Sequence, residues 1–226
     1  MTEKNYQLLE HYMWECMCDS AHDREHVYRV LYNALQIARG EQSVDYDVLI
    51  AACLLHDIGR KAQFADPTVC HAQAGAQMAW DFLQVSGFAK DFADRVRHCI
   101  ETHRFRKAVP PQTTEAKILF DADKLDVVGA VGIARTLMYK GDQAEPLYQI
   151  LPNGEISDGS ADEGSSFFRE YRFKLEKLYG QFLTQRGAAL ALERQSIARD
   201  FYMQLYREVN EGRREAKEIL QSHITE

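Results

Sequence analysis

The chain has 226 residues, of which 46% are hydrophobic and 27% charged, and its formal net charge is −7. This composition is that of an ordinary globular protein, and the negative charge argues against extended nucleic-acid binding, although a local basic pocket remains open. The longest apolar run, residues 48–55, is too short to span a membrane. The first residues lack the charged-then-apolar pattern of a secretory signal. We therefore expect a protein without membrane segments.

The cysteines are odd in number, which disfavours a complete disulfide framework. They are Cys16, Cys18, Cys53, Cys70 and Cys99. Cys16 and Cys18 have the spacing of half a metal site, but no second pair completes it. We expect reduced thiols in a cytoplasmic protein.

Apolar residues recur at helical spacing through most of the chain, and no segment alternates as a strand would. The predicted helices cover residues 23–39, 46–58, 71–83, 91–103, 114–139 (as one or two helices), 167–185 and 188–221. Residues 60–69, which contain Asp66-Pro67, are predicted to be a loop. The sequence thus predicts an all-α fold in one domain over residues 1–226. Its helical-bundle core covers about 20–135, and a C-terminal helical hairpin lobe covers about 167–221.

Two glycine-bearing segments stand out from this pattern. Gly129 and Gly132 lie inside a predicted helix and indicate close packing against a neighbour. Residues 140–166 are rich in glycine, serine and acidic residues. A segment this long without periodicity is typical of a lid over a site or of a disordered insertion, and both interpretations stay open.

His56-Asp57 ends the most apolar predicted helix, so both side chains should be buried there. Burying an imidazole with a carboxylate is costly unless a partner compensates. A metal ion would compensate both, and the negative end of the helix dipole favours a cation. A simple His-Asp hydrogen bond that caps the helix is the alternative for the dipeptide taken alone.

The other histidines favour the metal. At about 100° per residue, His26, His71 and His103 lie on or beside the apolar faces of their helices, while His22 and His98 point away. Histidines on four segments are then predicted to face one interior, which is difficult without a metal or an anionic ligand. His22 and His26 have the spacing of a zinc-binding pair, but their polar neighbours indicate the start of a helix, with Asp23 as a cap.

A carboxylate from residues 121–126 could complete the site. Asp126 lies nearest the apolar face, Asp123 at its edge, and Asp121 faces elsewhere. Periodicity does not choose among them, and a solvated acidic face is the alternative.

The set formed by His26, His56-Asp57 and one of these aspartates resembles the H…HD…D motif of the HD-domain phosphohydrolase superfamily, which has an all-helical fold. The segments that carry the resemblance are His26-Val-Tyr-Arg29-Val, Leu54-Leu55-His56-Asp57-Ile58-Gly59 and Asp121-Ala-Asp123-Lys124-Leu-Asp126. The resemblance implies Asp123 as the last metal ligand. In motif order and trailing helices, the chain looks most like the small bacterial YedJ/YpgQ-type subgroup, which is associated with nucleotide pyrophosphohydrolase activity.

The resemblance implies a site with His26, His56, Asp57 and Asp123 as ligands of a divalent metal. Such a set suits Mn²⁺, Mg²⁺, Fe²⁺, Ni²⁺ or Zn²⁺. His71 and His103 resemble residues that bind a second metal in some members. We slightly prefer them as substrate contacts, because no further bridging carboxylate is evident in the sequence.

Cationic side chains beside the ligands could stabilise charge on phosphoryl oxygens. We assign catalytic roles to Asp57, Arg60 and Lys124. Lys61 and Arg29 are expected to contact substrate or to orient a ligand. Arg104, Arg106 and Lys107 follow His103 and are further candidates.

The expected function is hydrolysis of a nucleotide or related phosphate ester by a metal-activated water. Its partner is then a small phosphorylated molecule, and a homodimer is compatible with the sequence. Hydrolysis of a phosphodiester or alarmone is the alternative, and a non-catalytic module that binds a nucleotide or metal for signalling is a further one. The complete ligand set argues against the module.

Overall fold

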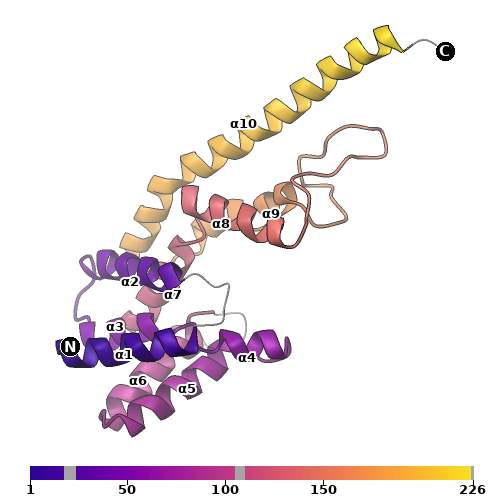
Figure 1. Cartoon of the computed structure of the whole chain (residues 1–226). Helices are drawn as coiled ribbons and strands as arrows, with labels where there is room; N and C mark the ends of the chain where they lie inside the picture. Colours follow the sequence, from indigo (N-terminus) through magenta and orange to yellow (C-terminus); the bar gives the residue numbers. More distant parts are fainter. Residues whose placement is uncertain (18–23, 105–109, 225–226) are drawn as a thin grey trace. The chain divides into compact units, whose positions relative to one another are not determined.

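A computed structural model describes residues 1–17, 24–104 and 110–224 of the chain. The described residues are mostly helical and contain no β-strand (Figure 1), which confirms the predicted all-α class. They form two compact units. The first unit comprises Met1–Asp126 with Phe182–Ala189, and the second comprises Val127–Gln181 with the chain from Leu190 onward.

The first unit packs around one apolar helix. Its helices are α1 (Glu3–Cys16), α2 (Arg24–Ala38), α3 (Tyr46–Leu55), α4 (Arg60–Ala65), α5 (His71–Val85), α6 (Lys90–Thr102) and α7 (Thr114–Leu125). Helix α3 contacts α1, α2, α5, α6 and α7, and nearly all of its side chains from Val48 onward are buried. An unusually apolar helix is therefore the centre of the core, as its composition requires.

Side-chain caps fix where several of these helices begin. The side chain of Asp45 accepts hydrogen bonds from the N–H groups of Asp47 and Val48 at the start of α3. Thr113 accepts one from Ala116 N–H at the start of α7. These caps satisfy backbone donors that have no partner inside the helix.

Asp121 holds the segment that leads into the C-terminal helix α10 (Gln185–His223). Its carboxylate is fully buried and accepts hydrogen bonds from Leu183 N–H, Thr184 N–H and the Thr184 hydroxyl. Gly187 lies against it, since a Cβ there would be 2.5 Å from Asp121 Oδ2. Asp121 is thus buried by residues about sixty positions later in the chain, rather than solvated.

The second unit contains α8 (Gly129–Asp142), α9 (Phe167–Phe173), a short 3₁₀ helix (Leu175–Gly180) and most of α10. Its core is aromatic: Phe167 and Phe168 are fully buried, and Tyr171 stacks on Tyr202 with ring centroids 4.1 Å apart. Gly132 packs closely, because a Cβ there would be 2.3 Å from the carbonyl carbon of Val127.

Residues 143–166 connect α8 to α9 and are organised by turns. An isolated antiparallel bridge pairs Ile150 with Ile156. The buried ammonium of Lys140 donates to Ser165 Oγ at 2.7 Å and to the carboxylate of Glu145 at 2.5 Å. A buried lysine needs such partners to keep its charge.

Two predicted boundaries are wrong. Residues 60–65 form the short helix α4 inside the predicted loop, and the helix ends one residue before Asp66-Pro67. The single helix predicted over 167–185 is divided into α9 and the 3₁₀ helix, and α10 begins at Gln185. Residues 114–139, for which the sequence predicts one or two helices, form two, α7 and α8. Among the described helices, none combines the length and the apolar content needed to cross a bilayer.

Candidate metal centre

The predicted site residues come together where helices of the first unit begin or end. The contributing positions are His26 in the first turn of α2, His56 and Asp57 directly after α3, His71 as the first residue of α5, His103 directly after α6, and Asp123 in the last turn of α7. Close packing helps to assemble them. A Cβ on Gly59 would lie 2.3 Å from His71 O, so the turn after Asp57 touches the backbone of α5.

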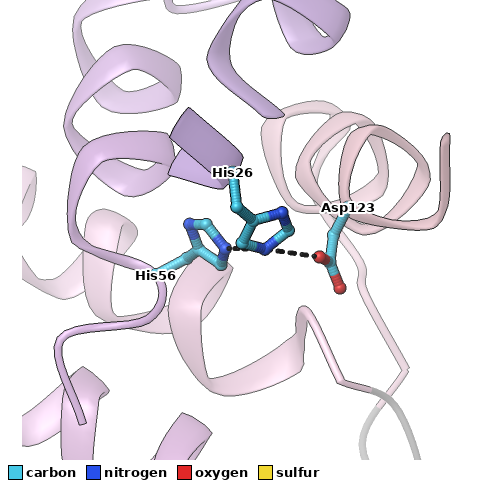
Figure 2. Close-up of side chains that lie close together, drawn as sticks. All are labelled: His26, His56 and Asp123. Atoms are coloured by element: carbon cyan, nitrogen blue, oxygen red, sulfur yellow. Dashed lines mark hydrogen bonds and ion pairs between the residues drawn. The ribbon is translucent and has the colours of Figure 1, made fainter. Parts of the chain in front are cut away.

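One group of possible ligands consists of His26, His56 and Asp123, whose donor atoms lie within 4.8 Å of one another. His26 Nε2 lies 3.4 Å from His56 Nε2 and 3.3 Å from Asp123 Oδ1. Figure 2 shows the three side chains pointing toward one another from α2, the end of α3, and α7. Both histidines are buried, while the Asp123 side chain is 25% exposed.

A second group consists of Asp57, His71 and His103, and its donor atoms also lie within 4.8 Å of one another. Asp57 Oδ1 is 3.4 Å from His71 Nε2 and 3.7 Å from His103 Nε2. Asp57 Oδ2 is instead 3.5 Å from His26 Nε2 and 3.6 Å from His56 Nε2. The two oxygens of one carboxylate therefore face two different pairs of histidines.

Hydrogen bonds at the other ring nitrogen orient each imidazole. His56 Nδ1 donates to Cys53 O at 2.8 Å, and His103 Nδ1 donates to Ile100 O at 2.5 Å. A carbonyl can only accept, so Nδ1 of each ring carries a proton and Nε2 faces the centre.

The remaining two rings are oriented by side chains. His26 Nδ1 is 2.7 Å from Asp126 Oδ2, and His71 Nδ1 is 2.6 Å from Gln63 Oε1. Arg104 Nη1 also lies 3.0 Å from His71 Nδ1. The shorter contact with Gln63 favours Nδ1 as the donor. Nε2 of all four histidines then faces the side where the carboxylates lie.

Several nitrogen and oxygen atoms that could ligate a metal at this centre are buried without a hydrogen-bond partner. They are Asp57 Oδ1, Asp57 Oδ2, His71 Nε2 and His103 Nε2. Orphaned polar atoms of this kind are rare in folded proteins and cost free energy. A set of imidazole nitrogens and carboxylate oxygens suits a divalent cation. The residues present therefore fit the metal that the sequence motif implies.

The protonation states of most of these groups suit metal binding. Burial lowers the pKa of His56 to about 4 and that of His71 to about 3, which keeps both rings neutral. Burial opposes ionisation of Asp57, but His56, His26 and Arg60 hold its pKa well below the usual value. His26 is different: burial would lower its pKa, but Asp123, Asp126 and Asp57 raise it to about 10. A cation bound at His26 must therefore displace a proton.

The predicted cationic residues are placed differently from one another. Arg60 Nε lies 3.0 Å from Asp57 Oδ2, so Arg60 joins the centre. Arg29 instead contacts Asp126. Lys124 Nζ lies 4.5 Å above the centroid of the Phe120 ring, and Lys61 is exposed. The catalytic role assigned to Lys124 stays a prediction.

Some sequence interpretations fall outside the described residues, namely those for Cys18, His22, Asp23, Arg106 and Lys107. The structure also adds a contact that the sequence interpretation missed. Gln63 reaches His71 because α4 places it one helical turn after Arg60. The interpretation of residues 60–69 as a loop hid this spacing.

Comparisons with known proteins agree with this geometry. The family model described as HD domain matches residues 24–128. YpgQ of Bacillus subtilis is 32% identical over 194 residues, which are 84% of this chain and 85% of that protein.

Solved structures are similar over most of the chain. The crystal structure of Bacillus subtilis YpgQ in complex with ADP aligns at 26% identity with a TM-score of 0.70, covering 91% of this chain and 95% of that one. A predicted HD superfamily hydrolase from an uncultured Thermotogales bacterium aligns at 29% identity with a TM-score of 0.61, covering 89% and 91%. The similarity includes the helices that carry the six residues of the centre, since they lie within the range of the family model.

Proposed function

Because the chain belongs to the HD-domain family of hydrolases, we propose that it uses divalent metal to hydrolyse a phosphate ester or anhydride bond of a nucleotide. The observation that carries the proposal is Asp57. Both of its oxygens are buried and make no hydrogen bond, although Oδ2 forms an ion pair with Arg60 at 3.0 Å. Each oxygen faces a different pair of histidines.

The ligand assignment follows from these contacts. One ion would be held by His26, His56, Asp123 and Asp57, and a second would be held by Asp57, His71 and His103. The sequence alone favours His71 and His103 as substrate contacts, because it shows no further bridging carboxylate. Asp57 can itself be that bridge, since Oδ1 lies near both of these histidines. We therefore favour two ions.

Divalent ions at such a centre supply Lewis acidity, which acidifies water and offsets negative charge on phosphate oxygens. The chain's own groups complement this. Arg60 lies beside Asp57 with its side chain 26% exposed, and Arg104 lies beside His71. Guanidinium groups match the geometry of phosphate oxygens. We assign Arg60 and Arg104 to hold the phosphate at the edge of the second ligand group.

The histidines and Asp57 also exclude water from the inner side of the centre. His56, His71, His103 and Asp57 are almost completely buried, whereas Asp123 and Arg60 are partly exposed. Substrate therefore approaches from the side of Asp123 and Arg60. Interactions between charges in a site with little water are stronger than in bulk water.

A nucleotide is the favoured substrate because YpgQ, a relative at 32% identity, has been crystallised with ADP. The net negative charge of the chain does not oppose this, because the two arginines provide a local positive region beside the metal ligands.

A panel of nucleoside mono-, di- and triphosphates and cyclic and linear phosphodiesters tests the proposal. Each is incubated with chain that has been stripped of metal and then supplied with Mn²⁺, Mg²⁺, Fe²⁺, Ni²⁺ or Zn²⁺, and products are separated by chromatography. We expect hydrolysis of at least one nucleotide only when metal is added. Activity that persists without metal contradicts the mechanism, and cleavage of phosphodiesters alone contradicts the substrate class.

A further inference from the structure

A chain of three polar groups, of which His26 and Asp126 are buried, leads away from the metal centre. His26 and Arg29 lie one helical turn apart on α2, and Asp126 directly follows α7. Arg29 Nε donates to Asp126 Oδ1 at 2.6 Å, and Arg29 Nη2 donates to Asp126 Oδ2 at 3.2 Å. Asp126 Oδ2 lies 2.7 Å from His26 Nδ1. One carboxylate thus joins a guanidinium fork to a ring that faces the centre.

Because Asp126 is buried, its carboxylate needs the contact with Arg29 in order to accept a hydrogen bond from His26 in the ionised form. Asp126 is 1% exposed, and an ionised carboxylate in such a place is unfavourable unless it is paired. The two donors on Arg29 supply that pairing in the geometry that guanidinium and carboxylate groups prefer. The ionised carboxylate then accepts the Nδ1 proton of His26, which leaves Nε2 facing Asp123 and Asp57.

We propose that Arg29 and Asp126 are positioning residues that fix the ring orientation and tautomer of His26 and thereby set the affinity of the metal held by His26, His56 and Asp123. This inference rests on the proposed function, since it concerns the same centre. It assigns Asp126 a role other than that of a direct metal ligand, because both of its oxygens already serve His26 and Arg29.

The inference also separates two roles for Arg29. Its side chain is 31% exposed, so a direct contact with substrate is the competing interpretation. If Arg29 acts through Asp126, replacing Arg29 does not change Mn²⁺ affinity further in a chain that already lacks the Asp126 carboxylate. If it contacts substrate, its replacement raises KM whether or not Asp126 is present. A double-mutant cycle distinguishes these cases.

The test titrates metal-stripped chain with Mn²⁺ and measures free Mn²⁺ by electron paramagnetic resonance, which does not depend on activity. The variants are Asp126→Ala, Arg29→Gln, Arg29→Lys and the double variant Asp126→Ala with Arg29→Gln. Arg95→Gln is the matched control, because it breaks an Arg–Asp pair elsewhere in the same unit. Circular dichroism checks that each variant is folded.

We expect Asp126→Ala to weaken Mn²⁺ binding by roughly 10–100-fold and Arg29→Gln to weaken it by a smaller factor, with partial recovery in Arg29→Lys. The double variant should bind as Asp126→Ala does, and Arg95→Gln as wild type does. If Asp126→Ala does not fold, Asp126→Asn preserves the shape of the side chain and takes its place.

Two results overturn the inference: Asp126 variants that bind Mn²⁺ as tightly as wild type, or an Arg29→Gln effect on KM that is undiminished in the Asp126→Ala background. A wild-type chain that binds no Mn²⁺ and hydrolyses no nucleotide instead refutes the proposed function. The failure of one is therefore distinguishable from the failure of the other.

Discussion

Gly59→Ala should disrupt the contact that holds helix α5 against the turn after Asp57. A Cβ at position 59 would lie 2.3 Å from His71 O, 2.5 Å from Gly75 N and 2.9 Å from Gly75 Cα. All three are backbone atoms, so no side-chain rotation relieves the overlap. Helix α5 must move away from Asp57, and His71 must move with it.

The size of the effect follows from the cost of overpacking. Extra methyl groups in a packed interior typically cost about 1–3 kcal/mol, and a clash with rigid backbone places Gly59→Ala near the upper end, at about 3 kcal/mol. For a domain of this size that loss lowers Tm by roughly 6–12 °C. The second ion should also bind more weakly, because His71 is one of its proposed ligands.

Gly141→Ala is the matched control, because nothing lies within 4 Å of a Cβ at that helical position. Alanine is more favourable than glycine in an open helix by about 0.5–1 kcal/mol, so Tm should stay unchanged or rise. Both variants are compared with wild type by calorimetry and by Mn²⁺ titration. A Gly59→Ala chain with wild-type Tm and wild-type Mn²⁺ binding would refute the role assigned to this close contact.

Three further changes are predicted. Asp121→Ala removes the hydrogen-bond acceptor for Leu183 and Thr184. The free energy of unfolding in urea should fall by about 1–3 kcal/mol, and an unchanged urea midpoint would contradict this. Chelation of metal should lower Tm. Mn²⁺ at a hundred times its Kd should then raise the free energy of unfolding by about 2.7 kcal/mol. A Tm that changes with neither treatment would argue against ions at Asp57. Asp45→Ala should cost about 1 kcal/mol at pH 7. Burial alone would raise the pKa of Asp45, but Val48 N–H and Arg95 lower it. Its contribution to stability is therefore present above about pH 4 and is lost as pH falls further. If the difference in unfolding free energy between wild type and Asp45→Ala does not shrink below that pH, the capping role of Asp45 is refuted.

Helical periodicity was sufficient to predict most of the centre. The histidines at positions 26, 71 and 103 lie on buried helix faces, and such faces are visible in the spacing of apolar residues. His56-Asp57 was recognisable because it ends the most apolar helix. Those predictions depended only on the direction in which each side chain leaves its helix, and the sequence of that one helix determines this direction.

The carboxylates could not be sorted in this way. Periodicity placed Asp126 nearest the interior, and Asp126 is indeed buried, but Arg29 from another helix engages it. Asp121 was predicted to face away from the site, and its burial depends on Leu183 and Thr184. Which partner a carboxylate meets is a tertiary property, and for Asp123 the family resemblance supplied what periodicity could not.

The boundary errors have a similar cause. Helix α4 is only six residues long, too short to show a period of its own. The charged and apolar residues from 167 to 185 fit a helix locally, yet Asp121 holds Leu183 and Thr184 outside it. Tertiary contacts override local propensity in such short segments.

The proposed role of Asp57 in binding metal for hydrolysis is tested by comparing Asp57→Asn with the exposed control Asp142→Asn. Metal content and product release are measured on the same preparations with the best nucleotide substrate. Loss of a shared ligand should remove several kcal/mol of transition-state stabilisation, so kcat/KM should fall at least about a hundredfold. Bound metal should fall as well, while the control keeps both. Undiminished metal content and nucleotide hydrolysis in Asp57→Asn would show that Asp57 is not a metal ligand needed for hydrolysis.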